Sequence, residues 1–285
     1  MLQRIASFAP LLAFALATSC VFDATATGQE PAAIPIKKLI LPGEAFLVKG
    51  RPAFILTPAK AAATKPQPWI LYAPTLPAYP DEHEKWMHEQ FLAAGVAVAG
   101  IDVGEAYGSP QGRELFTALH DELTTNRGFA RRPCLLGRSR GGLWVTSWAC
   151  EHPDKVAGIA GIYPVFDLRT YPGLAKAAPA YGLQPDELEA KLDEHNPIAR
   201  VAVLAQAKVP AFLIHGDDDK VVPLKENSAE FAARYRAAGS ADAVTLVVAE
   251  GQGHNYWEGF FRCRELIDFA IARAQAGAAT KAGPR

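Results

Sequence analysis

The sequence predicts an α/β fold built on a mostly parallel, twisted sheet with helices on both faces. Two observations support this prediction. Short apolar runs of strand length alternate with segments of helical length through most of the chain. Such alternation is typical of a parallel sheet whose right-handed crossovers place helices on both faces. The alternation of strands and helices stops between about residues 164 and 208, where we expect a small insert rather than further strands.

The predicted strands are apolar runs bounded by glycine, proline or polar turn residues. They cover residues 45–49, 53–57, 69–73, 96–101, 133–136, 157–162, 210–215 and 244–249. The first two are short and are joined by Gly50, Arg51 and Pro52, which indicates an opening hairpin. The remaining strands alternate with helices and are therefore expected to be parallel.

The predicted helices carry start and stop signals at their ends. They cover residues 81–94, 113–125, 143–150, 186–192 and 257–274. Asp81 is expected to cap the first helix, and Pro153 follows the end of the third. The fourth is short and amphipathic, and it lies within the insert.

A chain of 285 residues with 49% hydrophobic residues fits one large α/β domain with an ample core. We expect that domain to span residues 41–276 and to include the insert at about 164–208. A linker over residues 27–40 precedes it, and a disordered tail over residues 277–285 follows it.

Residues 1–26 are expected to be a signal peptide. A single positive charge at Arg4 precedes an apolar stretch, residues 5–17, that is too short to span a membrane. Small residues at 24–26 fit ordinary signal cleavage. Alternatively, the segment that ends at Cys20 resembles a loose bacterial lipobox, which would leave a lipid anchor on that cysteine. Both alternatives predict an exported protein of the bacterial periplasm or cell envelope, either secreted or anchored.

The formal net charge of −1 argues against nucleic acid as a partner, because phosphate binding requires a clearly basic face. No internal apolar run reaches the roughly 20 residues that a transmembrane helix requires, so no transmembrane domain is expected. Neither a cofactor nor a metal site is predicted. His83 and His88 resemble a zinc-binding helix pattern, but one extra residue between them turns the second imidazole away.

Cys134, Cys150 and Cys263 remain after ordinary signal cleavage, an odd number for an oxidising compartment. Cys134 and Cys150 are expected at the same depth, because they lie at similar distances from Ser139 along a strand and a helix. A helix packed on a sheet normally holds the Cα atoms too far apart for a disulfide. Buried free thiols are therefore favoured over a disulfide between the two.

Three polar segments follow predicted strands. The first is Gly137–Gly142, a G-x-S-x-G turn around Ser139 with a strand before it and a helix after it. The second contains three aspartates at 217–219, and the third contains His254. Because the carboxyl ends of parallel strands meet at one rim of an open sheet, these residues can converge there.

The chain order Ser, Asp, His and the strand–turn–helix setting of Ser139 resemble the α/β-hydrolase superfamily. Within it, the segment His215–Pro223 is similar to the HGxxDxxVP acid turn of esterases and prolyl-oligopeptidase-like hydrolases. The resemblance covers roughly residues 40 to 275. It implies that the insert at 164–208 forms a lid over the pocket, and a small one.

This resemblance implies a catalytic triad. Ser139 is the expected nucleophile, and because a serine hydroxyl is weakly nucleophilic it needs an adjacent base, for which His254 is the candidate. Asp219 is expected to accept the His254 ring N–H, since in similar sequences the acid stands four residues after the histidine of the acid turn. Asp217 and Asp218 compete for this role but are better explained as turn formers. The alternative role of His254 is to cap the final helix.

An oxyanion hole needs two backbone N–H donors. Arg140, directly after the nucleophile, is expected to supply one. The other is expected from the loop after the strand at 69–73, where prolines cannot donate and Leu76 is preferred over Thr75. The chain lacks the HGGG run that many lipases and esterases carry in this loop.

Arginine on both sides of the nucleophile is unusual for a lipase. Arg138 is a candidate substrate-binding residue, and further candidates on the same rim are Glu105, Tyr107 and Tyr163. The Arg140 guanidinium is expected either to reach the oxyanion, as in glucuronoyl esterases with a similar Ser-Arg elbow, or to hold an anionic or sugar group. The alternative is that both arginines pair with acidic neighbours such as Glu105 and hold the loops together.

The sequence therefore predicts an exported serine hydrolase that works through an acyl-enzyme intermediate. The expected partner is a small-molecule ester substrate, with carbohydrate-linked esters included, because the arginines beside Ser139 and the small lid argue against long-chain lipids. A prolyl-oligopeptidase-like peptidase is the alternative, although no propeller domain precedes the hydrolase domain. A non-catalytic binding protein on this fold is disfavoured, since a pure binder has no need of all three triad residues.

Overall fold

The computed structural model describes residues 37–59 and 66–279. The predicted signal peptide, its cleavage and lipidation sites with Cys20, and most of the predicted linker lie outside the described residues. Lys37, near the end of that linker, is buried, and its ammonium group donates hydrogen bonds to the carbonyl oxygens of Leu76 and Tyr79. The last part of the predicted linker is therefore anchored on the folded domain.

An eight-stranded, mostly parallel sheet in the order β1-β2-β4-β3-β5-β6-β7-β8 confirms the predicted α/β class. The strands are β1 (Gly43–Val48), β2 (Arg51–Leu56), β3 (Trp69–Ala73), β4 (Ala97–Ile101), β5 (Cys134–Arg138), β6 (Gly158–Ile162), β7 (Ala211–Gly216) and β8 (Val244–Ala249). The β1–β2 and β2–β4 pairs are antiparallel. The pairs that join β4, β3, β5, β6, β7 and β8 are parallel.

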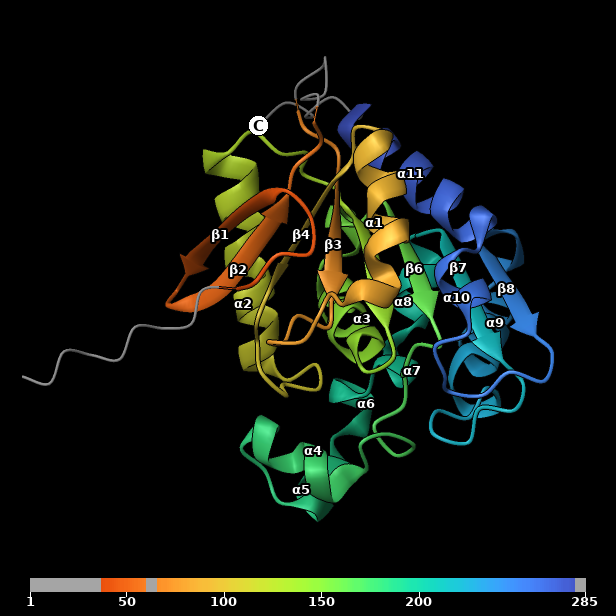
Figure 1. Cartoon of the computed structure of the whole chain (residues 1–285). Helices are drawn as coiled ribbons and strands as arrows, with labels where there is room; N and C mark the ends of the chain where they lie inside the picture. Colours follow the sequence, from red (N-terminus) through yellow and green to blue (C-terminus); the bar gives the residue numbers. More distant parts are fainter. Residues whose placement is uncertain (1–36, 60–65, 280–285) are drawn as a thin grey trace, which may run out of the picture. The chain divides into compact units, whose positions relative to one another are not determined.

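Helices cover both faces of the sheet (Figure 1). The α-helices are α1 (Glu82–Ala93), α2 (Pro110–Asp121), α3 (Gly141–Glu151), α4 (Leu174–Tyr181), α5 (Pro185–Ala190), α6 (Leu192–His195), α7 (Pro197–Arg200), α8 (Ala202–Gln206), α9 (Glu230–Ala237), α10 (Glu258–Phe261) and α11 (Arg264–Ala279). Short 3-10 or π-helical turns cover Glu122–Asn126, Pro153–Lys155, Lys225–Ala229 and Ala241–Ala243.

Alternating strand residues supply two apolar clusters, one on each face of the sheet. On β3, Trp69 and Leu71 pack with α2 and α3, whereas Ile70 and Tyr72 pack with α1 and α11. Successive side chains of a strand point to opposite faces, so a strand covered on both sides must be apolar throughout. This requirement explains why β3, β4, β5 and β6 are buried along their whole length.

The first two helices begin at capping residues. Asp81 caps α1 as predicted, and Glu84 completes a capping box by accepting from the Asp81 backbone N–H. The second helix begins earlier than predicted, at Pro110, because Ser109 caps it. Proline suits the first helical position, where its missing N–H would have no partner anyway.

At the carboxyl end, the structure corrects the sequence prediction twice. The expected single helix over 257–274 is broken after Phe261 into α10 and α11. Helix α11 then continues to Ala279, into the segment predicted to be a disordered tail. It continues because its buried face, which includes Ala274 and Gly277, stays packed on the sheet beside β5 and β6.

The insert between β6 and β7 holds the short helices α4 to α8, where the sequence predicted one helix. Two buried asparagines hold the start of the insert, Asn227 from outside the insert and Asn196 from within it. Asn227 Oδ1 accepts from the backbone N–H groups of Phe166 and Asp167. Asn196 Oδ1 accepts from the Leu168 N–H. Figure 1 shows α4 and α5 beyond the end of the sheet toward which the arrow of β3 points.

Cys134 and Cys150 are buried free thiols, which confirms the preference for thiols over a disulfide. Burial raises the pKa of each thiol to about 12. Cys263 is half-buried and also free. In the part of the chain that the structure describes, no helix combines the length and apolar character needed to cross a membrane.

Candidate active site

The turn between β5 and α3 holds Ser139 in a left-handed backbone conformation, with a φ of 50°. Non-glycine residues rarely adopt this region, so surrounding contacts must hold the turn. A Cβ atom on Gly141 would lie 2.2 Å from the carbonyl oxygen of Ala73. One on Gly142 would lie 2.6 Å from the carbonyl oxygen of Val165. The two glycines therefore let α3 start directly against its neighbours, which leaves Ser139 at the end of the sheet.

Ser139, His254 and Asp219 form a continuous chain of hydrogen bonds. The Ser139 hydroxyl lies 2.9 Å from His254 Nε2, and His254 Nδ1 lies 2.8 Å from Asp219 Oδ2. Because a carboxylate only accepts, Nδ1 carries the proton and Nε2 is free to accept the serine proton. The three residues follow the carboxyl ends of β5, β8 and β7. The structure thus brings the three predicted residues together at one rim of the sheet.

Of the three neighbouring aspartates, Asp219 is the one in contact with His254. It is buried, whereas Asp217 and Asp218 are exposed. Asp217 accepts from a backbone N–H in the turn after β8, and Asp218 pairs with Lys220 at 2.7 Å. The geometry therefore agrees with the choice of Asp219 as the acid and of the other two as turn residues.

Asp219 is held as an anion by its hydrogen-bond donors. Burial acts to raise the pKa of Asp219, but the donors outweigh burial and hold that pKa well below its usual range. These donors are His215, His254 and the backbone N–H groups of Val221 and Val222. His215 is fully buried and also contacts Ser228 Oγ at 2.8 Å, which indicates a structural role.

Tyr163 packs against the histidine of this chain. The ring centroids of Tyr163 and His254 lie 4.4 Å apart, and Phe260 meets the tyrosine edge-on at 4.9 Å. A ring packed on the imidazole limits its rotation and so keeps Nε2 directed at the serine. Tyr163 was predicted on this rim, and the structure places it in the site.

A cavity of about 220 Å³ opens beside Ser139. Its described lining combines the serine and histidine with two arginines and four tyrosines, and it contains no carboxylate. The lining residues are Pro74, Tyr79, Arg138, Ser139, Arg140, Tyr163, Tyr171, Val221, His254, Asn255 and Tyr256. Tyr171 comes from the insert, so the predicted lid contributes to the cavity.

Arg138 lines the cavity but is already paired. Its Nη1 lies 3.0 Å from Asp81 Oδ2 and 3.0 Å from Glu84 Oε2, and the Glu84 side chain is fully buried. The guanidinium also lies over the rings of Tyr79 and Tyr256, at 4.9 and 5.1 Å. This arrangement favours the alternative, in which Arg138 pairs with acidic neighbours and joins α1 to the serine turn. A contact between Arg138 and the substrate stays a prediction.

Arg140 also lines the cavity, and its Nη1 pairs with Glu105 Oε1. Glu105 and Tyr107 are not among the described lining residues, and their role as substrate contacts stays a prediction. Tyr107 is buried, and its carbonyl oxygen accepts from the Tyr181 hydroxyl of the insert. Burial, followed by the charge of Glu105, raises the pKa of Tyr107 to about 12. Tyr107 therefore ties the insert to the rim.

The two predicted oxyanion donors differ in their surroundings. Arg140 is the N-cap residue of α3, and the first N–H groups of a helix have no intrahelical partner. Leu76 is absent from the cavity lining and packs against the core beneath α2 and α3. Its carbonyl oxygen accepts from the Tyr79 N–H. The Leu76 N–H as second donor stays a prediction.

Three tyrosines that line the cavity were not predicted from the sequence: Tyr79, Tyr171 and Tyr256. Tyr256 stacks on His83 of α1 with ring centroids 4.1 Å apart. Its position two residues after the predicted base was a usable signal, as was the position of Tyr79 on the loop that follows β3. Tyr171 lies in the insert, where no motif distinguishes it.

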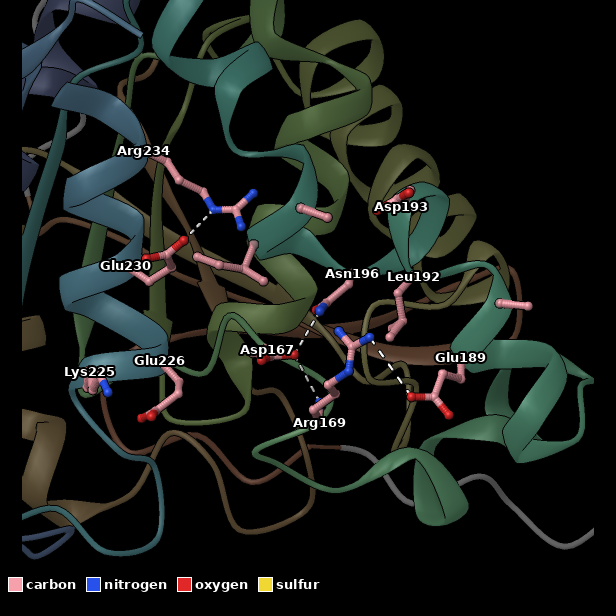
Figure 2. Close-up of a pocket in the computed structure, with 13 residues that line it drawn as sticks. Asp167, Arg169, Glu189, Leu192, Asp193, Asn196, Lys225, Glu226, Glu230 and Arg234 are labelled. Atoms are coloured by element: carbon pink, nitrogen blue, oxygen red, sulfur yellow. Dashed lines mark hydrogen bonds and ion pairs between the residues drawn. The ribbon is translucent and has the colours of Figure 1, made fainter. Parts of the chain in front are cut away.

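Two further pockets in the described residues lie apart from Ser139. One, of about 550 Å³, lies between the insert and α9 (Figure 2). Its charged side chains largely satisfy one another, since Asp167 accepts from Asn196 and Arg234 pairs with Glu230. The other, of about 710 Å³, lies between the β1–β2 turn and α2. Over residues 37–59 and 66–279, no group of three or more His, Cys, Asp or Glu side chains could hold a metal ion.

The model of the prolyl oligopeptidase family matches residues 114–270 of the 285-residue chain, which is more than half of it. The matched segment contains Ser139, Asp219 and His254. No protein of curated function matches the sequence.

Solved structures share the fold. A puromycin-hydrolyzing peptidase of Mycobacterium tuberculosis has a TM-score of 0.63 at 19% identity, over 82% of this chain and 40% of that one. MPT51 (FbpC1) of Mycobacterium tuberculosis has a TM-score of 0.64 at 16% identity, over 85% and 100%. Est1E from Butyrivibrio proteoclasticus has a TM-score of 0.61 at 18% identity, over 82% and 99%. At these identities the likeness shows the fold alone.

Proposed function

We propose that this protein cleaves small carboxylic esters through an acyl-enzyme intermediate on Ser139. The proposal starts from its family, because the chain belongs to the prolyl oligopeptidase family of the α/β-hydrolase superfamily and is a serine hydrolase. One observation carries the proposal: an unbroken hydrogen-bond chain runs from Ser139 through His254 to Asp219 beside a cavity of about 220 Å³. Nucleophile, base and carboxylate are thereby assembled before a substrate binds.

In the first half-reaction, the Ser139 oxygen attacks the ester carbonyl carbon while its proton passes to His254 Nε2. Asp219 stabilises the resulting imidazolium, because its lowered pKa keeps it ionised. The oxyanion accepts hydrogen bonds from the Arg140 N–H and from the loop that contains Leu76. Collapse of the tetrahedral intermediate expels the alcohol, which takes its proton from His254.

In the second half-reaction, a water molecule replaces the alcohol. His254 takes a proton from this water as its oxygen attacks the acyl carbon. The second tetrahedral intermediate collapses, Ser139 leaves with the proton held by His254, and the carboxylic acid is released. The same three residues therefore serve both halves of the reaction.

Esters are favoured over peptides because of the charges around the cavity. A peptidase that recognises a free amino terminus needs a carboxylate to pair with the ammonium group, and the described lining holds two arginines and no carboxylate. The tyrosine rings suit a short acyl chain or a small sugar, so carbohydrate-linked esters are included. Family membership supports a prolyl-oligopeptidase-like peptidase as the second candidate.

Labelling by a fluorophosphonate probe tests the nucleophile. The wild type should be labelled, whereas Ser139→Ala should not, because the probe reacts with an activated serine. Ser147→Ala, which removes a serine hydroxyl from α3 outside the cavity lining, is the matched control and should label normally. A folded wild-type protein that resists the probe would contradict the proposal.

Turnover then separates esterase from peptidase. Acetyl and butyryl 4-nitrophenyl esters should be cleaved far faster than the octanoyl ester or aminoacyl anilides. His254→Ala should lower kcat by about 10⁴-fold or more, as is typical when a triad base is removed. Faster cleavage of anilides than of short esters would favour the peptidase.

We also propose that the protein is exported, on the basis of the apolar stretch at residues 5–17. Expression in a bacterial host, followed by fractionation and mass measurement, tests this. A lipoprotein would be membrane-associated and would lose that association in Cys20→Ser, whereas ordinary cleavage near 24–26 would give a periplasmic protein with or without the substitution. Full-length protein confined to the cytoplasm would contradict export.

A further inference from the structure

The cavity beside the nucleophile has an unbalanced charge. Two arginines line it, and its described lining contains no carboxylate. Arg138 is neutralised from outside the cavity by Asp81 and Glu84, each at 3.0 Å. Arg140 differs, because its acidic partner, Glu105, has a half-exposed side chain that lies outside the lining.

We propose that the Arg140 guanidinium binds a carboxylate of the substrate, so that the enzyme prefers esters with a negative charge close to the ester bond. This inference rests on the proposed function and adds the chemical class of substrate: a half-ester of a dicarboxylic acid, or the ester of a hydroxy acid. Arg140 directly follows Ser139 in the chain, so a carboxylate bound by its side chain lies near the scissile carbonyl group.

The guanidinium has donors available for a ligand. It presents five N–H groups in a planar fork that matches a carboxylate, and its contact with Glu105 involves Nη1. The side chain of Arg140 is 23% exposed, whereas that of Arg138 is 5% exposed. Arg140 is therefore the arginine that a ligand in the cavity can reach.

Glu105 shows that a carboxylate can pair with this guanidinium. It comes from the loop between β4 and α2, and its side chain is 43% exposed. Ion pairs this accessible contribute little net stability, because water and salt screen them. A substrate carboxylate can therefore displace Glu105 or share the guanidinium with it, and Glu105 acts as an internal competitor.

The neighbouring rings suit a short, charged substrate. The Tyr79 ring centroid lies 5.9 Å from the Arg140 guanidinium carbon, and Tyr171 and Tyr256 also line the cavity. The cavity is small, with a volume of about 220 Å³. A half-ester of a short dicarboxylic acid fits this space, whereas a long acyl chain does not.

The test compares esters that differ in charge and hardly in shape. Monoethyl succinate carries a carboxylate where ethyl succinamate carries a neutral amide. A second pair, O-butyryl glycolate and O-butyryl glycolamide, places the same difference on the alcohol side. The measured quantity is the ratio of kcat/KM for the charged ester over that for its neutral partner, taken within each protein variant.

The wild type should prefer the charged ester of at least one pair by about tenfold or more. Arg140→Gln should lower that ratio roughly 10- to 100-fold, the range for a hydrogen bond to a charged group. Arg140→Lys should retain part of the preference, because lysine keeps the positive charge and lacks the planar set of donors.

Glu105→Gln should raise the ratio by up to about fivefold, because it removes the carboxylate that competes for Arg140. Arg234→Gln breaks an exposed ion pair outside this cavity and should leave the ratio unchanged.

Two results would overturn the proposal while leaving the esterase function intact: a ratio near one for both pairs in the wild type, or a ratio that Arg140→Gln does not change. Failure of the wild type to hydrolyse any of these esters, charged or neutral, would instead refute the proposed function. If Arg140→Gln proves inactive, the Glu105→Gln variant provides the test. An unchanged or lower ratio of kcat/KM values in Glu105→Gln would contradict the proposal that Glu105 competes with the substrate carboxylate for Arg140.

Discussion

Replacing Arg138 with methionine should destabilise the fold by about 2–3 kcal/mol at pH 7 and by much less at pH 5. Arg138 is buried beside the nucleophile, and its guanidinium contacts both Asp81 and Glu84. Methionine is flexible and packs well against aromatic rings, so the loss of packing is small. The main effect is that Glu84 loses its opposite charge.

The magnitude follows from the burial of Glu84. Burial raises the pKa of Glu84 above its ordinary value of 4.5, and Arg138 is the strongest influence that opposes this rise. Without Arg138 the carboxyl group should be neutral at pH 7, where it can still bond the Tyr72 hydroxyl at 2.6 Å. Holding it neutral at 2.5 pH units above its ordinary pKa of 4.5 costs about 3.4 kcal/mol. This free energy is an upper limit, because the raised pKa of Glu84 already destabilises the wild-type protein by part of the same amount.

The sign of the pH dependence follows from the same group. Below its ordinary pKa of 4.5, Glu84 is neutral in both the folded and the unfolded state, so folding carries no cost from it. As pH rises, the unfolded chain ionises while the buried group in the variant does not, and the variant loses about 1.4 kcal/mol per unit. The difference from the wild type should therefore fall below about 1 kcal/mol at pH 5.

Urea unfolding followed by tryptophan fluorescence at pH 5 and pH 7 measures both differences. Glu84→Gln in the Arg138→Met background removes the titrating group, so it should recover part of the loss at pH 7 and remove its pH dependence. Arg234→Met breaks an exposed pair with Glu230 and should cost less than about 0.5 kcal/mol. Equal destabilisation by Arg138→Met at both pH values, or none at pH 7, would refute the reasoning.

Two further substitutions test the frame around the site. Gly142→Ala should greatly lower the melting temperature or prevent folding, because its Cβ would lie 2.6 Å from the Val165 carbonyl oxygen; a variant with wild-type stability would contradict the close approach. Asn227→Ala should cost about 2–3 kcal/mol, since the backbone N–H groups of Phe166 and Asp167 lose their acceptor. Hydrogen exchange at those two amides should accelerate, and unchanged protection would show that another group accepts from them.

The three residues of the hydrogen-bond chain could be predicted because each is encoded locally. Ser139, Asp219 and His254 each follow an apolar run in a turn marked by glycine. A strand followed by such a turn places its polar residue at the rim of the sheet whatever the rest of the chain does. The choice of Asp219 over its two neighbours came from the resemblance to a known acid turn, whose residues are also close together in the chain.

The insert and the last helix were harder to predict, for a physical reason. The sequence predicted one helix in the insert, where the structure has α4 to α8. Its helices are too short for a clear hydrophobic period, although they bury apolar side chains such as Leu188, Leu192 and Leu204 in the core. The end of α11 was missed because small residues such as Ala274 and Gly277 carry a weak signal, although the sheet buries them.

Arg138 and Arg140 show most clearly which properties the sequence determines and which depend on the folded structure. Local chain chemistry determined that Arg138 and Arg140 flank the nucleophile on the rim of an α/β sheet. Their different roles depend on partners that folding brings from other segments. Glu84 on α1 neutralises Arg138 in the interior, whereas Glu105 meets Arg140 at the surface. Charge, burial and access to the cavity are properties of the packed environment, and a sequence motif carries none of them.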